Sequence, residues 1–145
     1  MRVLVQKCKE ASCTVDDKIT GEIKQGLVLF VGFTSGDTIE EIKYLCKKIV
    51  NLRIFEDENG IMNKSILEQD NQEVLSISQF TLYADTKKGN RPSYINALNG
   101  DLAIKLYDLF NEELSKYVKV EVGKFGSDMQ IYLINDGPTT ILLER

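Results

Sequence analysis

The sequence predicts a single α/β domain with mixed sheets, covering residues 1–145. Three observations predict it. The length of 145 residues suits one compact domain. No linker, low-complexity tract or internal repeat divides the chain. Strand-like runs alternate with two helical patterns, so that the elements follow the order ββ-βα-βα-βββ.

The first half of the chain is expected to supply three strands, a helix and a hairpin. Residues 3–5 and 11–15 are rich in strand formers, with a turn at residues 16–18. The apolar run 27–33 is typical of a strand covered on both faces. Asp37 and Glu40 match an N-cap and its capping-box partner, and apolar residues then recur at helical spacing over 38–51. A hairpin is expected around an Asn-Gly turn at residues 59–60.

The second half is expected to supply a strand, a helix and three closing strands. Residues 74–80 form the strand, and the second helix is marked by Leu102, Leu106, Leu109, Phe110 and Leu114. The closing strands are residues 118–122, 129–134 and 139–143. Between the last two strands, the simplest interpretation of Asn135-Asp136-Gly137-Pro138 is a hairpin turn. A cis Gly137–Pro138 peptide would turn the neighbouring carbonyl groups in a direction that a trans peptide does not allow. The sequence does not determine whether this peptide is cis or trans.

The composition excludes several classes of site. The chain has no histidine, so Ser-His-Asp triads, Cys-His pairs and HExxH zinc sites are all excluded. Its three cysteines lack CxxC spacing, so neither a disulfide framework nor a zinc cluster is indicated. We therefore expect no cofactor and no metal. The longest apolar run is too short to cross a bilayer, and the first residues turn polar too soon for a signal peptide, so we expect a cytoplasmic protein with no membrane contact.

Two further features could carry function or be ordinary surface. Leu75 and Ile77 are expected to share a strand face with Gln79 and Thr81, so a core face would end in an amide and a hydroxyl. Such groups can line a pocket, although the strand could simply emerge into solvent.

The net charge of −4 disfavours non-specific nucleic-acid binding. Nevertheless, a Gly/Pro loop concentrates three cations that could hold phosphates or be a plain charged surface: Lys87, Lys88 and Arg91.

Four motifs in their order and spacing closely resemble the D-aminoacyl-tRNA deacylase family. They are Ser78-Gln79-Phe80-Thr81, Gly89-Asn90-Arg91-Pro92-Ser93, Phe125-Gly126-Ser127-Asp128-Met129 and Asn135-Asp136-Gly137-Pro138. The resemblance covers essentially the whole chain. It implies a cytosolic homodimer with an α/β fold that hydrolyses the ester joining a D-amino acid to the 3′ end of tRNA. It also implies activity on glycyl-tRNA mischarged on tRNA-Ala.

The resemblance implies a role for each site residue. Ser78, Gln79, Phe80 and Thr81 would form the catalytic wall that seats the 3′-terminal adenosine and the ester. Gly137 and Pro138, joined by a cis bond, would enter the partner subunit's active site and reject L-amino acids. The remaining assignments are substrate binding by Phe125 and Met129, support of the Gly-Pro loop by Lys7 and Asn135, and binding of the tRNA acceptor stem by Lys87, Lys88 and Arg91.

The chain departs from the family's usual residues at three positions. Lys7 replaces a usual Arg, and a Lys cannot make the planar, bidentate hydrogen bonds of a guanidinium. Ser127 replaces an Ala, and Thr139 replaces a Val. Because nothing in the sequence supplies an adjacent base for Thr81, we expect catalysis assisted by the 2′-hydroxyl of the substrate.

Two alternatives remain at this point. One is the related proofreading module of some threonyl-tRNA synthetases, which removes L-serine. The other is a dimeric tRNA-binding protein without catalytic activity.

Overall fold

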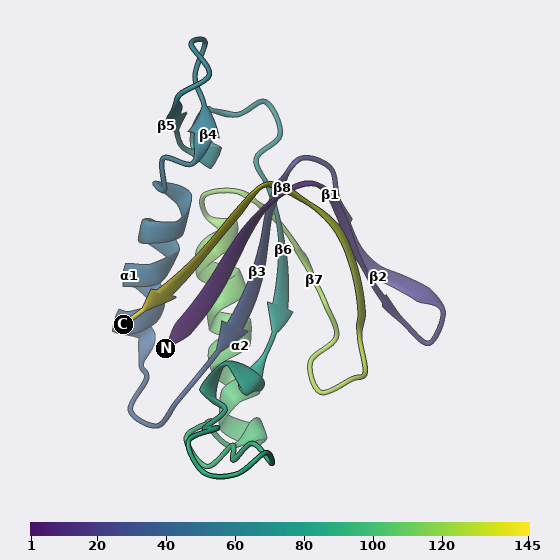
Figure 1. Cartoon of the computed structure of the whole chain (residues 1–145), viewed down its shortest axis with the longest axis vertical. Coiled ribbons are helices and arrows are strands. Elements are labelled where there is room, and N and C mark those ends of the chain that lie inside the picture. Colours follow the sequence, from purple (N-terminus) through teal and green to yellow (C-terminus); the bar gives the residue numbers. More distant parts are fainter.

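A six-stranded mixed sheet with two α-helices on one face forms the body of the protein in the computed structural model, which describes residues 1–145 (Figure 1). The strand order is β2-β1-β3-β6-β7, and β8 pairs with the free side of β1. The sheet strands are β1 (Arg2–Val15), β2 (Lys18–Ile23), β3 (Gly26–Gly32), β6 (Glu73–Ser78), β7 (Lys119–Val122) and β8 (Gln130–Glu144). The predicted α/β class with a mixed sheet is confirmed.

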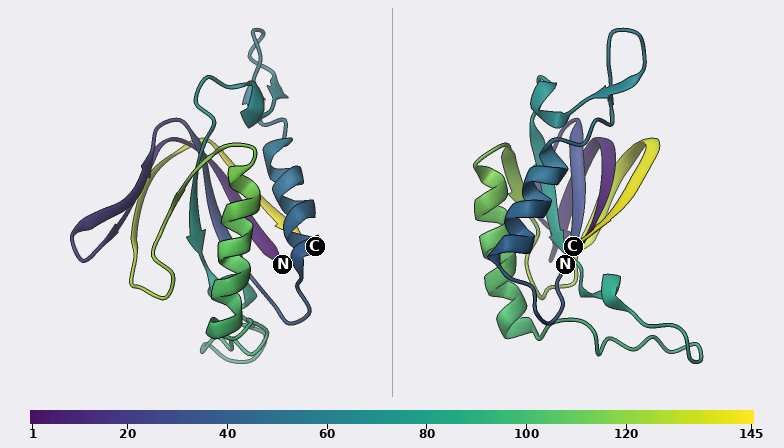
Figure 2. Two further views of the ribbon diagram at one scale, coloured as in Figure 1. Left: turned by 180° about the vertical axis from the view of Figure 1, so that it is seen from behind. Right: turned by 90° about the vertical axis from the view of Figure 1, so that its left-hand side faces the viewer.

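The helices and the minor elements lie between these strands. They are α1 (Ile39–Val50), the small hairpin of β4 (Phe55–Glu56) and β5 (Met62–Lys64), the 3₁₀ turns η1 (Ile66–Glu68) and η2 (Phe80–Tyr83), and α2 (Gly100–Ser115). Both α-helices cover the same face of the sheet (Figure 2). Neither is long and apolar enough to cross a membrane.

Burial on both faces of the sheet explains the apolar run in β3. Leu27 and Leu29 face the helices within a cluster of 21 buried residues. Val28, between them, faces the opposite side within a second cluster of eight buried residues. Successive strand side chains point to opposite faces, so a strand covered on both sides must be apolar throughout. The prediction for this strand is confirmed.

The N-cap of helix α1 lies one residue later than predicted. Thr38 is the N-cap and Glu41 completes the capping box, so the assignment to Asp37 and Glu40 is wrong. The Asp37 carboxylate is used elsewhere, because it accepts hydrogen bonds from the Met1 ammonium group at 2.6 Å and from the Thr34 N–H at 2.7 Å. The sequence therefore predicted a capping box correctly but placed it one residue too close to the N-terminus.

The two last predicted strands are one continuous strand, so the hairpin turn at residues 135–138 is wrong. Gln6 pairs with Thr140 and Cys8 pairs with Asn135, so two steps along β1 face five along β8. The extra residues loop out as a bulge, and pairing with β1 resumes beyond them. Likewise, the predicted strands 3–5 and 11–15 are both part of β1. The Gly137–Pro138 peptide within the bulge is cis.

Strand β6 ends at Ser78, two residues before the predicted end. The Gln79 N–H donates to Val31 O at 2.7 Å, and the chain then enters η2. The sequence predicted that Gln79 and Thr81 continue the strand face of Leu75 and Ile77, and this prediction is wrong. The local hydrogen bonds of η2 replace the strand pairing at this point, with Ala84 N–H donating to Thr81 O at 3.0 Å.

The second helix is present where it was predicted, but its buried face differs from its leucine pattern. Leu102 and Leu109 are 53% and 40% exposed. The residues that α2 buries are Ala103, Tyr107, Phe110, Glu113 and Leu114. Leucine positions alone therefore predicted the existence of this helix better than its orientation.

Candidate functional site

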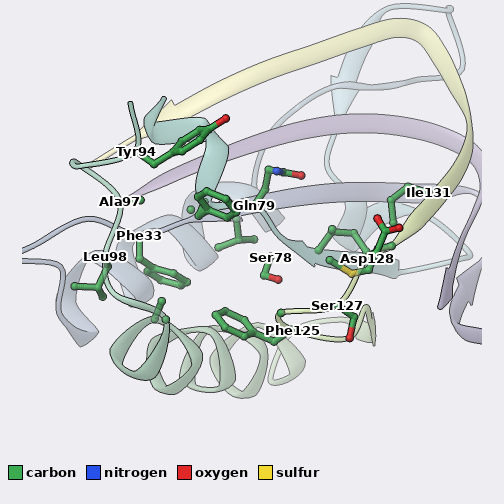
Figure 3. Close-up of a pocket in the computed structure, with 18 residues that line it drawn as sticks. Phe33, Ser78, Gln79, Tyr94, Ala97, Leu98, Phe125, Ser127, Asp128 and Ile131 are labelled. Carbon is green, nitrogen blue, oxygen red and sulfur yellow. The ribbon is translucent and has the colours of Figure 1, made fainter. Parts of the chain in front are cut away.

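A pocket of about 600 Å³ opens where β3 and β6 end, beside the first turn of α2 (Figure 3). Its remaining wall is the segment between β7 and β8. β3 and β6 are parallel, so their carboxyl ends meet at the same edge of the sheet. Ligands of α/β sheets commonly bind at this edge, and the volume is within the range of small-molecule sites.

The first wall of the pocket is formed by Ser78, Gln79 and Phe80. This wall depends on Gly32 at the end of β3. A Cβ at Gly32 would lie 2.8 Å from Gln79 O, which is a backbone atom that cannot easily move aside. Glycine therefore lets the two strand ends approach closely enough to place Gln79 at the pocket.

Thr81 belongs to this segment but does not line the pocket. Its hydroxyl oxygen accepts a hydrogen bond from Gln79 Nε2 at 2.5 Å. The first hydrogen bond within η2 runs from Leu82 N–H to Gln79 O at 3.4 Å. The N–H groups of Phe80 and Thr81 precede that bond, so the turn itself does not satisfy them.

Phe125, Ser127, Asp128 and Met129 form the opposite wall. Phe125 packs against Tyr107 of α2, with ring centroids 5.8 Å apart. The Tyr107 hydroxyl donates to Ser76 O at 2.7 Å and so ties this wall to β6. Burial raises the pKa of the Tyr107 hydroxyl above its ordinary value.

The chemistry available in the pocket is limited. Its polar side chains are Ser78, Gln79, Tyr94, Ser127 and Asp128. None of the 18 lining residues is a cysteine, lysine or arginine, and the chain has no histidine to act as a base. Nowhere in the chain do three or more His, Cys, Asp or Glu side chains gather to hold a metal ion. The pocket therefore suits binding and positioning rather than attack by an activated side chain.

Gly137 and Pro138 do not line this pocket within one chain. Both are exposed on β8. Asn135 holds the base of their bulge, because its Nδ2 donates to Lys7 O at 2.8 Å and to Thr139 O at 3.1 Å. The Lys7 ammonium lies 3.3 Å from Asp136 Oδ2 and is almost completely buried. The two predicted supporting residues thus contact the loop that they were expected to support.

The three cations of the predicted phosphate-binding loop lie away from the pocket wall. Lys87, Lys88 and Arg91 are exposed. They belong to a long loop between η2 and α2 that extends away from the sheet (Figure 2, right). The loop is closed by backbone hydrogen bonds between Asp85 and Ser93, at 2.7 and 2.9 Å.

Sequence reasoning missed several pocket residues. Phe33 lines the pocket from the end of the predicted strand 27–33, and Tyr94 and Leu98 line it from the irregular segment before α2. Asp128 was noticed only as part of a motif, and it supplies the one carboxylate of the pocket. The aromatic residue two positions after Pro92 of the Gly/Pro loop was the one local signal that could have indicated Tyr94.

Comparison with known proteins gives consistent results over the whole chain. The family model described as D-Tyr-tRNA(Tyr) deacylase matches residues 4–144. A D-aminoacyl-tRNA deacylase of Bacillus cytotoxicus is 57% identical over 145 residues, which is 99% of each chain.

Two solved structures are also similar to this chain. One, described as c-Myc DNA Unwinding Element Binding Protein, has a TM-score of 0.93 at 38% identity and is matched over 100% of this chain and 99% of that one. The other, described as a probable eukaryotic D-amino acid tRNA deacylase, has a TM-score of 0.84 at 18% identity, with 98% and 97% coverage. At that identity the second structure supports the fold alone.

Proposed function

The chain belongs to the D-Tyr-tRNA(Tyr) deacylase family, and from this premise we propose that it is a hydrolase that cleaves the ester of D-aminoacyl-tRNA. The products are a free D-amino acid and tRNA. The observation that carries the proposal is the 57% identity to a D-aminoacyl-tRNA deacylase over the full length of both chains. The pocket at Ser78, Gln79 and Phe80 gives the ester a place to bind.

The proposed mechanism is positioning with assistance from the substrate. Water adds to the ester carbonyl, the bond to the 3′ oxygen breaks, and that oxygen leaves with a proton. The vicinal 2′-hydroxyl of the terminal ribose helps to activate the water. The main-chain N–H groups of Phe80 and Thr81 stabilise the oxyanion, a role for which they are available because η2 does not use them. The Thr81 hydroxyl takes no part in the chemical step, because its oxygen already accepts a hydrogen bond from Gln79 Nε2 and the residue does not line the pocket.

The active protein is proposed to be a homodimer that acts in the cytoplasm, where its tRNA substrate is found. The Gly137–Pro138 loop of one copy would enter the pocket of the other. Two observations support this arrangement. β8 is an edge strand whose outer side is unpaired, and such edges favour association. Its exposed apolar side chains are Tyr132, Ile134 and Leu142, at 55%, 43% and 50%.

Selection against L-amino acids is proposed to work by rejection. The loop carbonyls at Gly137 and Pro138 would bind the α-amino group and collide with an L side chain. Contacts with one methyl group let a pocket discriminate between two substrates by only about 1–3 kcal/mol of binding free energy. A steric collision with the L side chain discriminates more strongly. Glycine has no side chain to collide, so we expect glycyl-tRNA, including glycine mischarged on tRNA-Ala, to be cleaved. Single-turnover assays with glycyl and L-alanyl esters check this, and equal resistance of the two would contradict it.

Lys7 is proposed to hold this loop in place through Asp136. We expect Lys7→Gln to lower the free energy of unfolding by about 1–3 kcal/mol, because the partly buried Asp136 carboxylate is left without its ammonium partner. We also expect it to lower the preference for D over L substrates. Lys7→Arg should keep both properties. Chemical denaturation and paired D and L deacylation assays are the measurements.

Lys9 provides a matched control for that experiment. Its ammonium group lies 4.0 Å from the other carboxylate oxygen of Asp136, but the side chain is 68% exposed. Exposed ion pairs contribute little, so Lys9→Gln should change stability by no more than about 0.5 kcal/mol. A Lys9 variant as impaired as the Lys7 variant would contradict the role given to Lys7.

The enzyme assay also separates the alternatives. Purified wild-type protein is incubated with D-tyrosyl-tRNA, and ester loss and tRNA retention are measured in parallel. Turnover supports the deacylase. Retention of tRNA without turnover would instead indicate a binding protein. Turnover of L-seryl-tRNA in preference to D-tyrosyl-tRNA would indicate a module like that of threonyl-tRNA synthetases.

A further inference from the structure

Two exposed aromatic rings stand together at the rim of the pocket. Phe80 is 55% exposed and Tyr94 is 41% exposed. Their centroids are 5.0 Å apart, and their planes are inclined at 73°. The rings come from separate segments, η2 and the loop before α2, and both line the pocket. Tyr94 is labelled in Figure 3. Two solvent-exposed rings of this kind are not needed for the core, so they are available to a ligand.

Tyr94 is held in place although it lies in an irregular segment. The backbone pair of Asp85 and Ser93 closes the loop directly before it. After it, the Thr34 hydroxyl donates to Asn96 O at 2.6 Å, and the Leu98 N–H donates to Phe33 O at 2.9 Å. The backbone on both sides of Tyr94 is therefore anchored and its ring packs against Phe80, whereas the neighbouring Ile95 is 85% exposed.

Positive charge lies in the same loop as the ring. Lys87, Lys88 and Arg91 are exposed, and none of them forms an ion pair, in a chain whose net charge is −4. Exposed aromatic rings together with unpaired cations are the combination that binds single-stranded nucleic acid. Bases stack on the rings, and the cations attract the phosphates.

We propose that Tyr94 stacks on the base of the nucleotide that precedes the 3′-terminal one. The terminal nucleoside occupies the pocket beside Phe80, and the loop cations contact the phosphates of the single-stranded 3′ end. This inference rests on the proposed deacylase function and adds a binding site for a second nucleotide at the rim of the ester pocket. Its consequence is a preference for substrates longer than one nucleoside.

The test compares two small substrates that share the same ester. They are the D-tyrosyl ester of adenosine and the D-tyrosyl ester of the trinucleotide CCA. Stacking of one base predicts that wild-type kcat/KM is about 5- to 150-fold higher for the trinucleotide. Tyr94→Leu should remove most of that ratio, and Tyr94→Phe, which keeps a ring, should preserve it. Ile95→Ala is the matched control and should leave the ratio unchanged.

A second substrate locates the contact at the base. A trinucleotide ester that lacks the penultimate base should lose most of the advantage with wild-type protein and show no further loss with Tyr94→Leu. If Tyr94→Leu lowers hydrolysis of the adenosine and trinucleotide esters by the same factor, Tyr94 shapes only the ester pocket and the inference is wrong. If wild-type protein cleaves neither ester nor D-tyrosyl-tRNA, the proposed function itself fails. These outcomes are distinguishable.

Discussion

Replacement of Gly137 by alanine is expected to lower kcat/KM for D-tyrosyl-tRNA by about 100-fold, because misplacement of a positioning group by about 1 Å has that effect. Gly137 has φ +113°, a conformation that side chains rarely adopt. An added Cβ would lie 2.7 Å from Thr139 Oγ1 and 2.9 Å from Thr139 N. The second of these is a backbone atom, so the loop must move and its carbonyls must move with it.

Gly60 provides a matched control for this variant. It has φ +75° and lies in the turn between β4 and β5, and a Cβ added there would meet no neighbouring atom within 4 Å. Gly60→Ala therefore carries a similar backbone cost of about 1–3 kcal/mol without a collision. We expect both variants to be destabilised and only Gly137→Ala to lose activity. Equal activities of the two variants would contradict a role for the loop in the reaction.

Removal of the 2′-hydroxyl from the terminal adenosine is expected to slow deacylation by about 100-fold or more, the usual contribution of general acid–base catalysis. Thr81→Val should keep most of the activity of the wild type. The reason is that the Thr81 hydroxyl oxygen already accepts from Gln79 Nε2 and the residue does not line the pocket. Single-turnover rates with the D-tyrosyl ester at the 3′ position are the measurement.

The spontaneous hydrolysis rate of each ester is the necessary control, because the 2′-hydroxyl also speeds the uncatalysed reaction. Only the ratio of enzymatic to spontaneous rate reports on the protein. If the 2′-deoxy substrate keeps that ratio while Thr81→Val loses it, Thr81 has a chemical role and the substrate does not assist.

The parts of the fold that the sequence predicted well are those set by local pattern. The continuous apolar run of β3 and the helical spacing of α1 each reflect contacts repeated along one element. The turn at Asp16 and Asp17 was also predicted, and both residues have positive φ. In each case, the residues that determine the structure are neighbours in sequence.

The errors arose where a distant segment decides the conformation. The residues around Gly137 carry turn chemistry, yet β8 continues past them because β1 pairs with both flanks of the bulge. The strand face of Leu75 and Ile77 ends at Gln79 because β6 pairs with β3 only as far as the bond from the Gln79 N–H to Val31 O, after which the chain turns into η2. Neither partner could be identified from a periodicity.

The same distinction between local pattern and distant contacts applies to the residues of the candidate site. Ser78, Gln79, Phe80, Phe125 and Met129 were singled out through motifs, and the pocket brings them together. Gly137 and Pro138 do not line that pocket within one chain. The sequence of one chain does not show how two copies would pack against each other. Tyr94 and Gly32 were missed, since a ring in a loop and a glycine at a strand end acquire their roles only from what packs beside them.

The decisive measurement is hydrolysis of D-tyrosyl-tRNA and L-tyrosyl-tRNA by the wild-type protein, followed side by side. We expect rapid loss of the D ester and persistence of the L ester at its spontaneous rate. Equal cleavage of both esters would contradict chiral rejection by the Gly137–Pro138 loop. Cleavage of neither would contradict the deacylase function.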